Sequence, residues 1–200
     1  MSTKEDILEQ LVGEYLLHKG YFIRNNIKFV PRKDHPEFVS NKDSNHSDID
    51  ILAYHPKIQG PRKVLAVSCK SWQIGFNVSS KLDGIRNNKI ANGRDAWKSF
   101  RELTVPKWSE AFVKAVEENT GLSKFTYVLA VTRVVGDPAI WQEHQPFRDA
   151  LNGNPIEILT FSKMFSEVVQ ELNRENKKTL AATDIGRMAQ LIAASGYKPI

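Results

Sequence analysis

The sequence predicts an α/β domain with a mixed central β-sheet flanked by helices. Two short apolar runs, residues 48–54 and 64–72, are separated by a link rich in proline and glycine, which is typical of two neighbouring strands. A third run, residues 124–135, is apolar on both faces, as expected of a central strand of a covered sheet. Helical patterns precede, separate and follow these runs. This order of elements favours an α/β fold over a helical bundle or an all-β sandwich.

Length and composition bound the class of protein. Two hundred residues, 41% of them hydrophobic, suit one domain, or one domain with an appendage, built on a sizeable core. The net charge of +5 permits attraction to a polyanion without establishing it. The single cysteine, Cys69, excludes an internal disulfide and a cysteine-cluster metal site. No apolar run approaches the ~20 residues that span a bilayer, and no signal peptide is visible, so we expect a cytoplasmic protein without a membrane partner.

The first quarter of the chain predicts a helix, a strand and a loop. Residues 3–19 carry an apolar arc at helical spacing, with Ser2 or Thr3 as the cap. Glu14 lies at the edge of that arc, where its structural interpretation is a boundary carboxylate with its head in water. Residues 21–30 predict a strand with a kink at its asparagine pair, and the polar, proline-containing segment 31–45 predicts a loop.

The remaining elements follow from the same patterns. Residues 74–92 show few helical features and predict an irregular excursion. Residues 173–178 predict a polar linker that divides a main domain, 1–175, from a helical C-terminal extension, 176–200. A further strand is expected at 156–160, and helices are expected at 93–103, 107–118, 139–151, 161–173 and 184–194, the last capped by Thr183.

The strand pair 48–54 and 64–72 concentrates polar side chains among apolar ones. Alternation places on one face of the first strand Asp48, Asp50 and Leu52, and on the other Ile49, Ile51 and Ala53. In the second strand it groups Val64, Ala66, Ser68 and Lys70 against Leu65, Val67 and Cys69. Burying such charges is costly unless they are paired or bind a metal. The pattern therefore indicates either a buried ion pair between Asp50 and Lys70 or a functional site, with Cys69 as a small core residue.

A basic stretch follows the strand pair. Only Asp83 and Asp95 offset its six cations, which are Lys81, Arg86, Lys89, Arg94, Lys98 and Arg101. One interpretation is a solvated basic face. The other is a surface that contacts phosphates, with Trp72, Phe76 or Trp97 nearby for packing or stacking.

Together these residues resemble the PD-(D/E)xK nuclease superfamily. The resemblance lies in a first helix with an inward glutamate, Glu14, then Ile-Asp50-Ile on one strand and Val-Ser-Cys-Lys70-Ser-Trp on the next. It runs from about residue 5 to residue 72 and is closest to restriction endonucleases and archaeal Holliday-junction resolvases. The resemblance implies a restriction-endonuclease-like core and hydrolysis of phosphodiester bonds in double-stranded DNA. Restriction-like enzymes that cut both strands commonly act as symmetric dimers, so the resemblance also implies a homodimer.

The resemblance also implies roles for individual residues. Asp50 would be the main ligand of a Mg²⁺ ion, for which Mn²⁺ substitutes, with Asp48 as a helper and the Cys69 backbone carbonyl as a further ligand. Lys70 would orient the attacking water or neutralise the phosphate. Glu14 would hold a metal-bound water or a second cation.

Ser68 departs from this pattern. The family carries a glutamate two residues before the lysine, and a hydroxyl is a poorer ligand for a hard cation. Three explanations stay open: a site that has lost activity, a site completed by Glu14 or Asp48, or an engineered replacement of the glutamate. The sequence thus predicts a metal-dependent DNA endonuclease or, alternatively, a non-catalytic DNA-binding module that keeps the nuclease fold.

Overall fold

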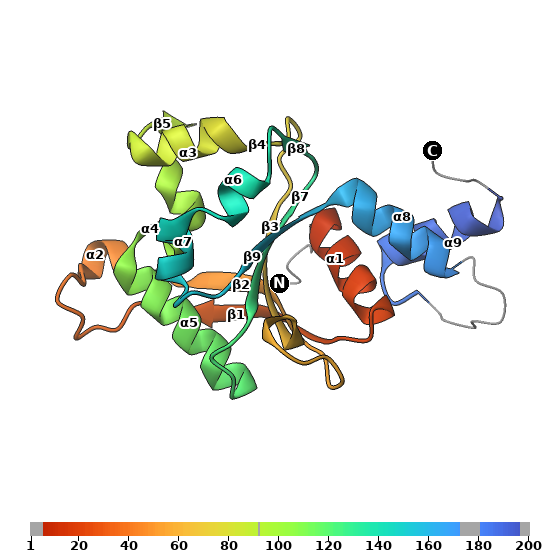
Figure 1. Cartoon of the computed structure of the whole chain (residues 1–200), viewed down its shortest axis with the longest axis horizontal. Helices are drawn as coiled ribbons and strands as arrows, with labels where there is room; N and C mark the ends of the chain where they lie inside the picture. The colour runs from red at the N-terminus through yellow and green to blue at the C-terminus, as the bar shows by residue number, and fades with distance from the viewer. Residues whose placement is uncertain (1–5, 92, 173–180, 197–200) are drawn as a thin grey trace.

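The computed structural model describes residues 6–91, 93–172 and 181–196, and its framework is a five-stranded mixed sheet (Figure 1). The strand order is β1 (Phe22–Phe29), β2 (Ser47–Tyr54), β3 (Val64–Lys70), β7 (Thr126–Val131) and β9 (Ile156–Thr160). The first three strands pair antiparallel, whereas β3, β7 and β9 run parallel. The α/β class and the mixed sheet flanked by helices are confirmed.

Helices cover both faces of the sheet. Figure 1 shows α1 (Ile7–His18), α8 (Phe161–Leu172) and α9 (Asp184–Ala194) together on one side. The opposite side carries α4 (Arg101–Thr104), α5 (Pro106–Thr120) and α7 (Gln145–Ala150). No helix in the described ranges is long and apolar enough to cross a membrane.

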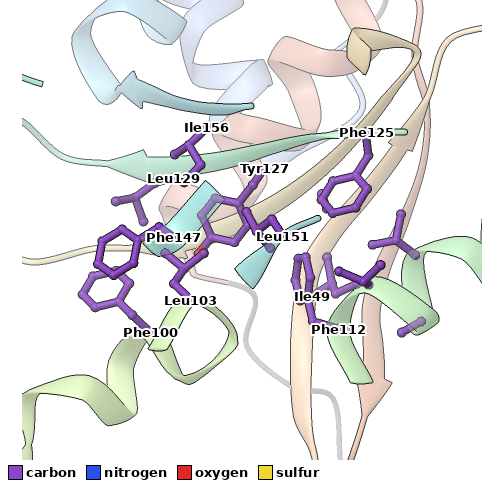
Figure 2. Packing of buried hydrophobic residues seen from close by; sticks show 14 of the residues in the cluster. Ile49, Phe100, Leu103, Phe112, Phe125, Tyr127, Leu129, Phe147, Leu151 and Ile156 are labelled. Atoms are coloured by element: carbon purple, nitrogen blue, oxygen red, sulfur yellow. The ribbon is translucent and has the colours of Figure 1, made fainter. Parts of the chain in front are cut away.

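Two hydrophobic clusters lie on the two sheet faces and share the central strands. All six residues of β7 are buried, and they alternate between the clusters: Val128 packs on the side of α1, and Leu129 on the side of α5. Figure 2 shows side chains of β7 meeting residues of α4, α5 and α7 in the second of these environments. The expectation of a central strand covered on both faces is therefore correct.

The strand expected over residues 124–135 is shorter than its apolar run. β7 ends at Val131, and Val134–Val135 form a separate strand, β8, paired parallel with β4 (Phe76–Asn77). Thr132 and Arg133 lie between them and bond to the loop that follows β3 instead of continuing the ladder. Valines stand on both sides of the break, at Val131 and Val134, so the pattern predicts one longer strand.

The stretch between β3 and α5 differs most from expectation. Residues 74–92 contain a helix, α3 (Val78–Arg86), whose N-cap Asn77 accepts a hydrogen bond from the backbone N–H of Ser80. The single helix expected over 93–103 is wrong: β6 (Arg94–Asp95), which pairs with β5 (Ile90–Ala91), precedes a 3-10 turn (Ala96–Phe100) and then α4.

Other helix boundaries also differ. The helix expected over 139–151 is two helices, α6 (Ala139–Gln142) and α7, because Pro146 has no N–H with which to continue the first. A short helix, α2 (Ser40–Asp43), interrupts the expected loop 31–45. The cap of α1 is Asp6, while the expected caps Ser2 and Thr3 and the expected linker 173–178 lie outside the described residues.

Candidate active site at the ends of β2 and β3

Asp50 and Lys70 lie where β2 and β3 stop pairing. The last paired positions at this end are Ile51 and Val67, so Asp50 and Ser68 follow directly. β1 contributes to the divergence, because Asn26 takes a left-handed backbone conformation (φ 56°) between the paired residues that flank Asp50. The kink expected at the asparagine pair is thus confirmed, and it accompanies the site.

Next to this kink, the face of β2 that we expected for Ile49 is wrong. Ile49 packs with Leu52 on the α5 side, whereas Ile51 and Ala53 pack on the α1 side, so the simple alternation breaks around Asp50. On β3 the alternation holds: Val64 and Ala66 belong to one cluster, and Leu65 and Val67 to the other.

The Asp50 carboxylate is removed from water, and its favourable interactions offset only part of the free-energy cost. Burial raises its pKa, and the nearby charges of Asp48 and Glu102 act in the same direction. Lys70 lowers the pKa, as does a hydrogen bond in which the backbone N–H of Cys69 donates to Asp50 Oδ2 at 2.6 Å. Among the described residues Lys70 forms no direct ion pair with Asp50. The two charges therefore lie close together without the contact that a buried ion pair would supply.

Glu102 joins this site from α4, and the sequence did not single it out. Its side chain is 6% exposed, and its Oε1 accepts a hydrogen bond from the Tyr127 hydroxyl at 2.7 Å. Tyr127 is fully buried on β7, and the nearby side chain of Ser68 acts to lower its pKa. Burial, then the charge of Glu102, raises the pKa of Tyr127 well above its usual value, so the phenol stays protonated.

Ser68 therefore lies near Tyr127, whose hydroxyl donates to the Glu102 carboxylate. Where the family motif would place a glutamate on β3, this chain has a hydroxyl, a phenol and then Glu102 from a helix. The sequence did not reveal the buried position of Glu102, because the helix expected over 93–103 has Phe100 and Leu103 on its buried side. The actual change from a 3-10 turn to α4 at Phe100 turns Glu102 inward as well.

Glu14 is not brought to Asp50. It is buried (1% exposed), so the interpretation as a boundary carboxylate in water is wrong. Its Oε2 accepts hydrogen bonds from the backbone N–H groups of Ala182 and Thr183 and from the Thr183 hydroxyl, all at 2.9–3.0 Å, while His18 Nε2 lies 3.3 Å from Oε1. The carboxylate thus anchors the segment that begins α9.

The acidic side chains of α1 that act on the site come from its N-terminal end. The charges of Glu9 and Asp6 reach Cys69, where they add to the effect of burial and of Asp50 in raising the thiol pKa well above its usual value. Cys69 packs against the cluster on the α1 side, as a core residue would. Asp48 is exposed and lies directly opposite Lys28 on β1.

The basic stretch is less available than its composition indicates. Lys81 Nζ lies 3.8 Å from the centre of the Trp72 ring, and the Arg101 guanidinium lies 4.6 Å from that of Trp108. Lys89 pairs with Asp83, and Lys98 pairs with Asp95. Arg86 is exposed, and the side chain of Arg94 lies outside the described part of the structure.

Among the groups of this site, only the carboxylates suit a hard divalent cation such as Mg²⁺. Mg²⁺ commonly uses one or two protein carboxylates, with waters and phosphate oxygens completing its shell. Asp50 and Glu102 offer such oxygens in a buried setting, where a cation would offset the desolvation that raises the Asp50 pKa. In the described residues no three histidine, cysteine or acidic side chains gather as ligands.

A cavity of about 650 Å³ lies apart from these residues, and its mainly apolar lining includes Leu82, Leu103 and Phe147. None of Asp50, Ser68 and Lys70 lines it, so this cavity and the polar residues of the candidate site do not coincide.

Comparisons of this chain with protein-family models, with curated proteins and with solved structures found no match.

Proposed function

We propose that this chain is a metal-dependent DNA endonuclease whose catalytic residues are Asp50, Lys70 and Glu102. The observation that carries the proposal is the desolvated Asp50 carboxylate, which has Lys70 as its favourable charge and Glu102 as a second carboxylate. A restriction-endonuclease-like core is supported by the mixed sheet, in which an antiparallel pair presents Asp50 and Lys70 at the ends of its strands.

Each of these residues would have its own role in the hydrolysis of a phosphodiester bond. When bound, Mg²⁺ or Mn²⁺ supplies positive charge for the reacting phosphate and lowers the pKa of a water. Asp50 and Glu102 would hold the cation, and Lys70 would orient the attacking water or neutralise the phosphate. Tyr127 acts as a positioning residue, since its hydroxyl donates to Glu102. Glu102, rather than Glu14, replaces the missing motif carboxylate.

The direct test is cleavage of supercoiled plasmid DNA with Mg²⁺ or Mn²⁺. We expect nicking or cleavage that falls at least about 100-fold in Lys70→Ala. It should also fall in Glu102→Gln, and Ser68→Glu should raise cleavage or metal affinity. Lys124→Ala is the matched control, because Lys124 is exposed and distant in sequence from the motif. If both the parent chain and Ser68→Glu leave every DNA substrate intact across divalent metals, the enzyme proposal fails.

A non-catalytic DNA-binding module is the second candidate. The observation that favours it is Ser68, a buried hydroxyl that offers no charge to a cation where the motif has a carboxylate. This candidate predicts salt-sensitive DNA binding without turnover. Arg86→Ala should weaken binding more than Lys98→Ala, since Lys98 is already neutralised by Asp95. Sedimentation of the same samples would test for the homodimer that is common among restriction-like enzymes that cut both strands.

A further inference from the structure

The loop directly after Lys70 has an apolar tip. Residues 71–75, which we name the Ile74 loop, connect β3 to β4. Ile74 is 82% exposed, the highest value among the large exposed hydrophobic side chains of the described residues. Gln73 beside it is also exposed. Figure 1 shows β4 and β8 beyond the ends of β3 and β7, so the loop lies at the edge of the sheet where the candidate site opens.

Several contacts fix the backbone of this loop. The Thr132 hydroxyl donates to the Trp72 carbonyl, and Arg133 Nη2 donates to the Ile74 carbonyl at 3.2 Å. The N–H of Gly75 closes a turn onto the Trp72 carbonyl at 3.0 Å. Gly75 has φ +84°, and a Cβ there would collide with the Arg133 side chain. The tip is therefore presented by an ordered support, which only glycine at position 75 permits.

Trp72 ties the loop to the aromatic core. Its ring stacks on Phe76 with 6.0 Å between ring centres and meets the edge of Phe100 at 5.9 Å. Lys81 covers the same indole. Trp72 is thereby occupied in packing, whereas Ser71, Gln73 and Ile74 are the exposed side chains of the loop.

We propose that Ile74 is a wedge that packs against or between the bases of double-stranded DNA whose phosphate is held at Lys70. This inference rests on the proposed function. Four residues span at most ~14 Å, so Ile74 lies within about four base-pair steps of the phosphate at Lys70. Apolar side chains inserted at base steps are a known means of kinking a duplex. The adjacent Gln73 amide can bond to a base edge, which would make the loop a specificity determinant.

The test is the affinity of the parent chain for a mixed-sequence duplex, measured at several salt concentrations with EDTA present so that no divalent cation supports cleavage. Ile74→Ala should weaken binding about tenfold, because the buried methylene groups are lost. The slope of affinity against salt should stay the same, since no phosphate contact is removed. Ile74→Leu should restore most of the affinity, and a duplex with a mismatch should bind more tightly only when Ile74 or Leu is present.

Ile90→Ala is the matched control, because Ile90 is 73% exposed on β5 and lies outside the loop. Equal affinities for Ile74→Ala and Ile90→Ala, with DNA binding otherwise intact, would overturn the wedge and leave the nuclease proposal standing. A change of oligomeric state in Ile74→Ala, without a change in DNA affinity, would likewise overturn it. Absence of DNA binding by the parent chain at every salt concentration would overturn both proposals.

Discussion

At the scale of single residues, the desolvated Asp50 carboxylate lowers the stability of the fold near neutral pH. Its pKa is raised in the folded chain, chiefly by burial, so the folded state binds the Asp50 proton more tightly than the unfolded state does. A group of this kind contributes stability that is present below its unfolded pKa and is lost as pH rises through its folded pKa. Near neutral pH the charged carboxylate therefore destabilises the fold in the absence of a cation.

Asp50→Asn should reverse this cost. The asparagine side-chain oxygen can still accept the Cys69 N–H, but it carries no charge to desolvate. We expect the variant to gain stability relative to the parent as pH rises from about 4 to 7, on the order of 1 kcal/mol. Urea unfolding at several pH values measures the difference, with Asp149→Asn, at an exposed position on α7, as the control. A difference that is constant with pH, or that favours the parent at pH 7, would contradict this explanation.

Tyr127 offers a second test at the residue scale. Its hydroxyl is the donor to the buried Glu102 carboxylate. Tyr127→Phe should lower the free energy of unfolding by roughly 1–3 kcal/mol, because it leaves a buried charged acceptor without its partner. The double variant with Glu102→Gln should cost less than the sum of the two single changes. Strict additivity in chemical denaturation would show that the two side chains do not act together.

At the scale of elements, Glu14 joins two helices that are far apart in the sequence. The carboxylate on α1 accepts hydrogen bonds from the segment that begins α9, while Thr183 caps that helix through its hydroxyl and the N–H of Gly186. A Cβ at position 186 would collide with the Glu14 carboxylate. The residue that resembled a catalytic carboxylate therefore has a structural explanation that is complete without any metal.

Glu14→Ala should loosen α9 in particular. Loss of hydrogen bonds to a charged acceptor is expected to cost about 1.5–3 kcal/mol. Hydrogen exchange in peptides from 181–195 should accelerate, while exchange in β7 changes much less. Glu117→Ala, an exposed glutamate on α5, is the control. Unchanged exchange in α9 would show that its apolar contacts with α1 and α8 hold it without Glu14.

At the scale of the whole molecule, the central strands connect the two hydrophobic clusters. Trp72, Trp108 and Trp141 belong to or pack against the cluster on the α5 side, and Val128 faces the other cluster. If the chain unfolds as one unit, Val128→Ala should shift the unfolding midpoint seen by tryptophan fluorescence, although its cavity is on the opposite face.

Leu129→Ala provides the matched change on the tryptophan side, with an expected loss of about 2–5 kcal/mol. For each variant, fluorescence and far-ultraviolet circular dichroism should report the same midpoint. A Val128→Ala transition that is altered by circular dichroism but unchanged by fluorescence would mean that the two faces unfold separately.

The sequence by itself determined the features that depend on local pattern. Apolar periodicity located α1, α5, α8 and α9 and the five strands of the sheet, since a helix or strand must bury a stripe or a face in register with its own repeat. Strand alternation also placed Ser68 and Lys70 on one face of β3 and Cys69 on the other.

Only the tertiary structure decided which carboxylates meet. Glu14 and Glu102 each stand in a helical segment of ordinary pattern, and nothing local distinguishes them. The break at Phe100 turns Glu102 toward Tyr127 and Asp50, while the return of the chain at Ala182 and Thr183 engages Glu14. Contacts between residues 25 to 169 positions apart depend on the path of the whole chain. The residue types of the site were therefore readable in the sequence, but the membership of Glu102 and the exclusion of Glu14 were not.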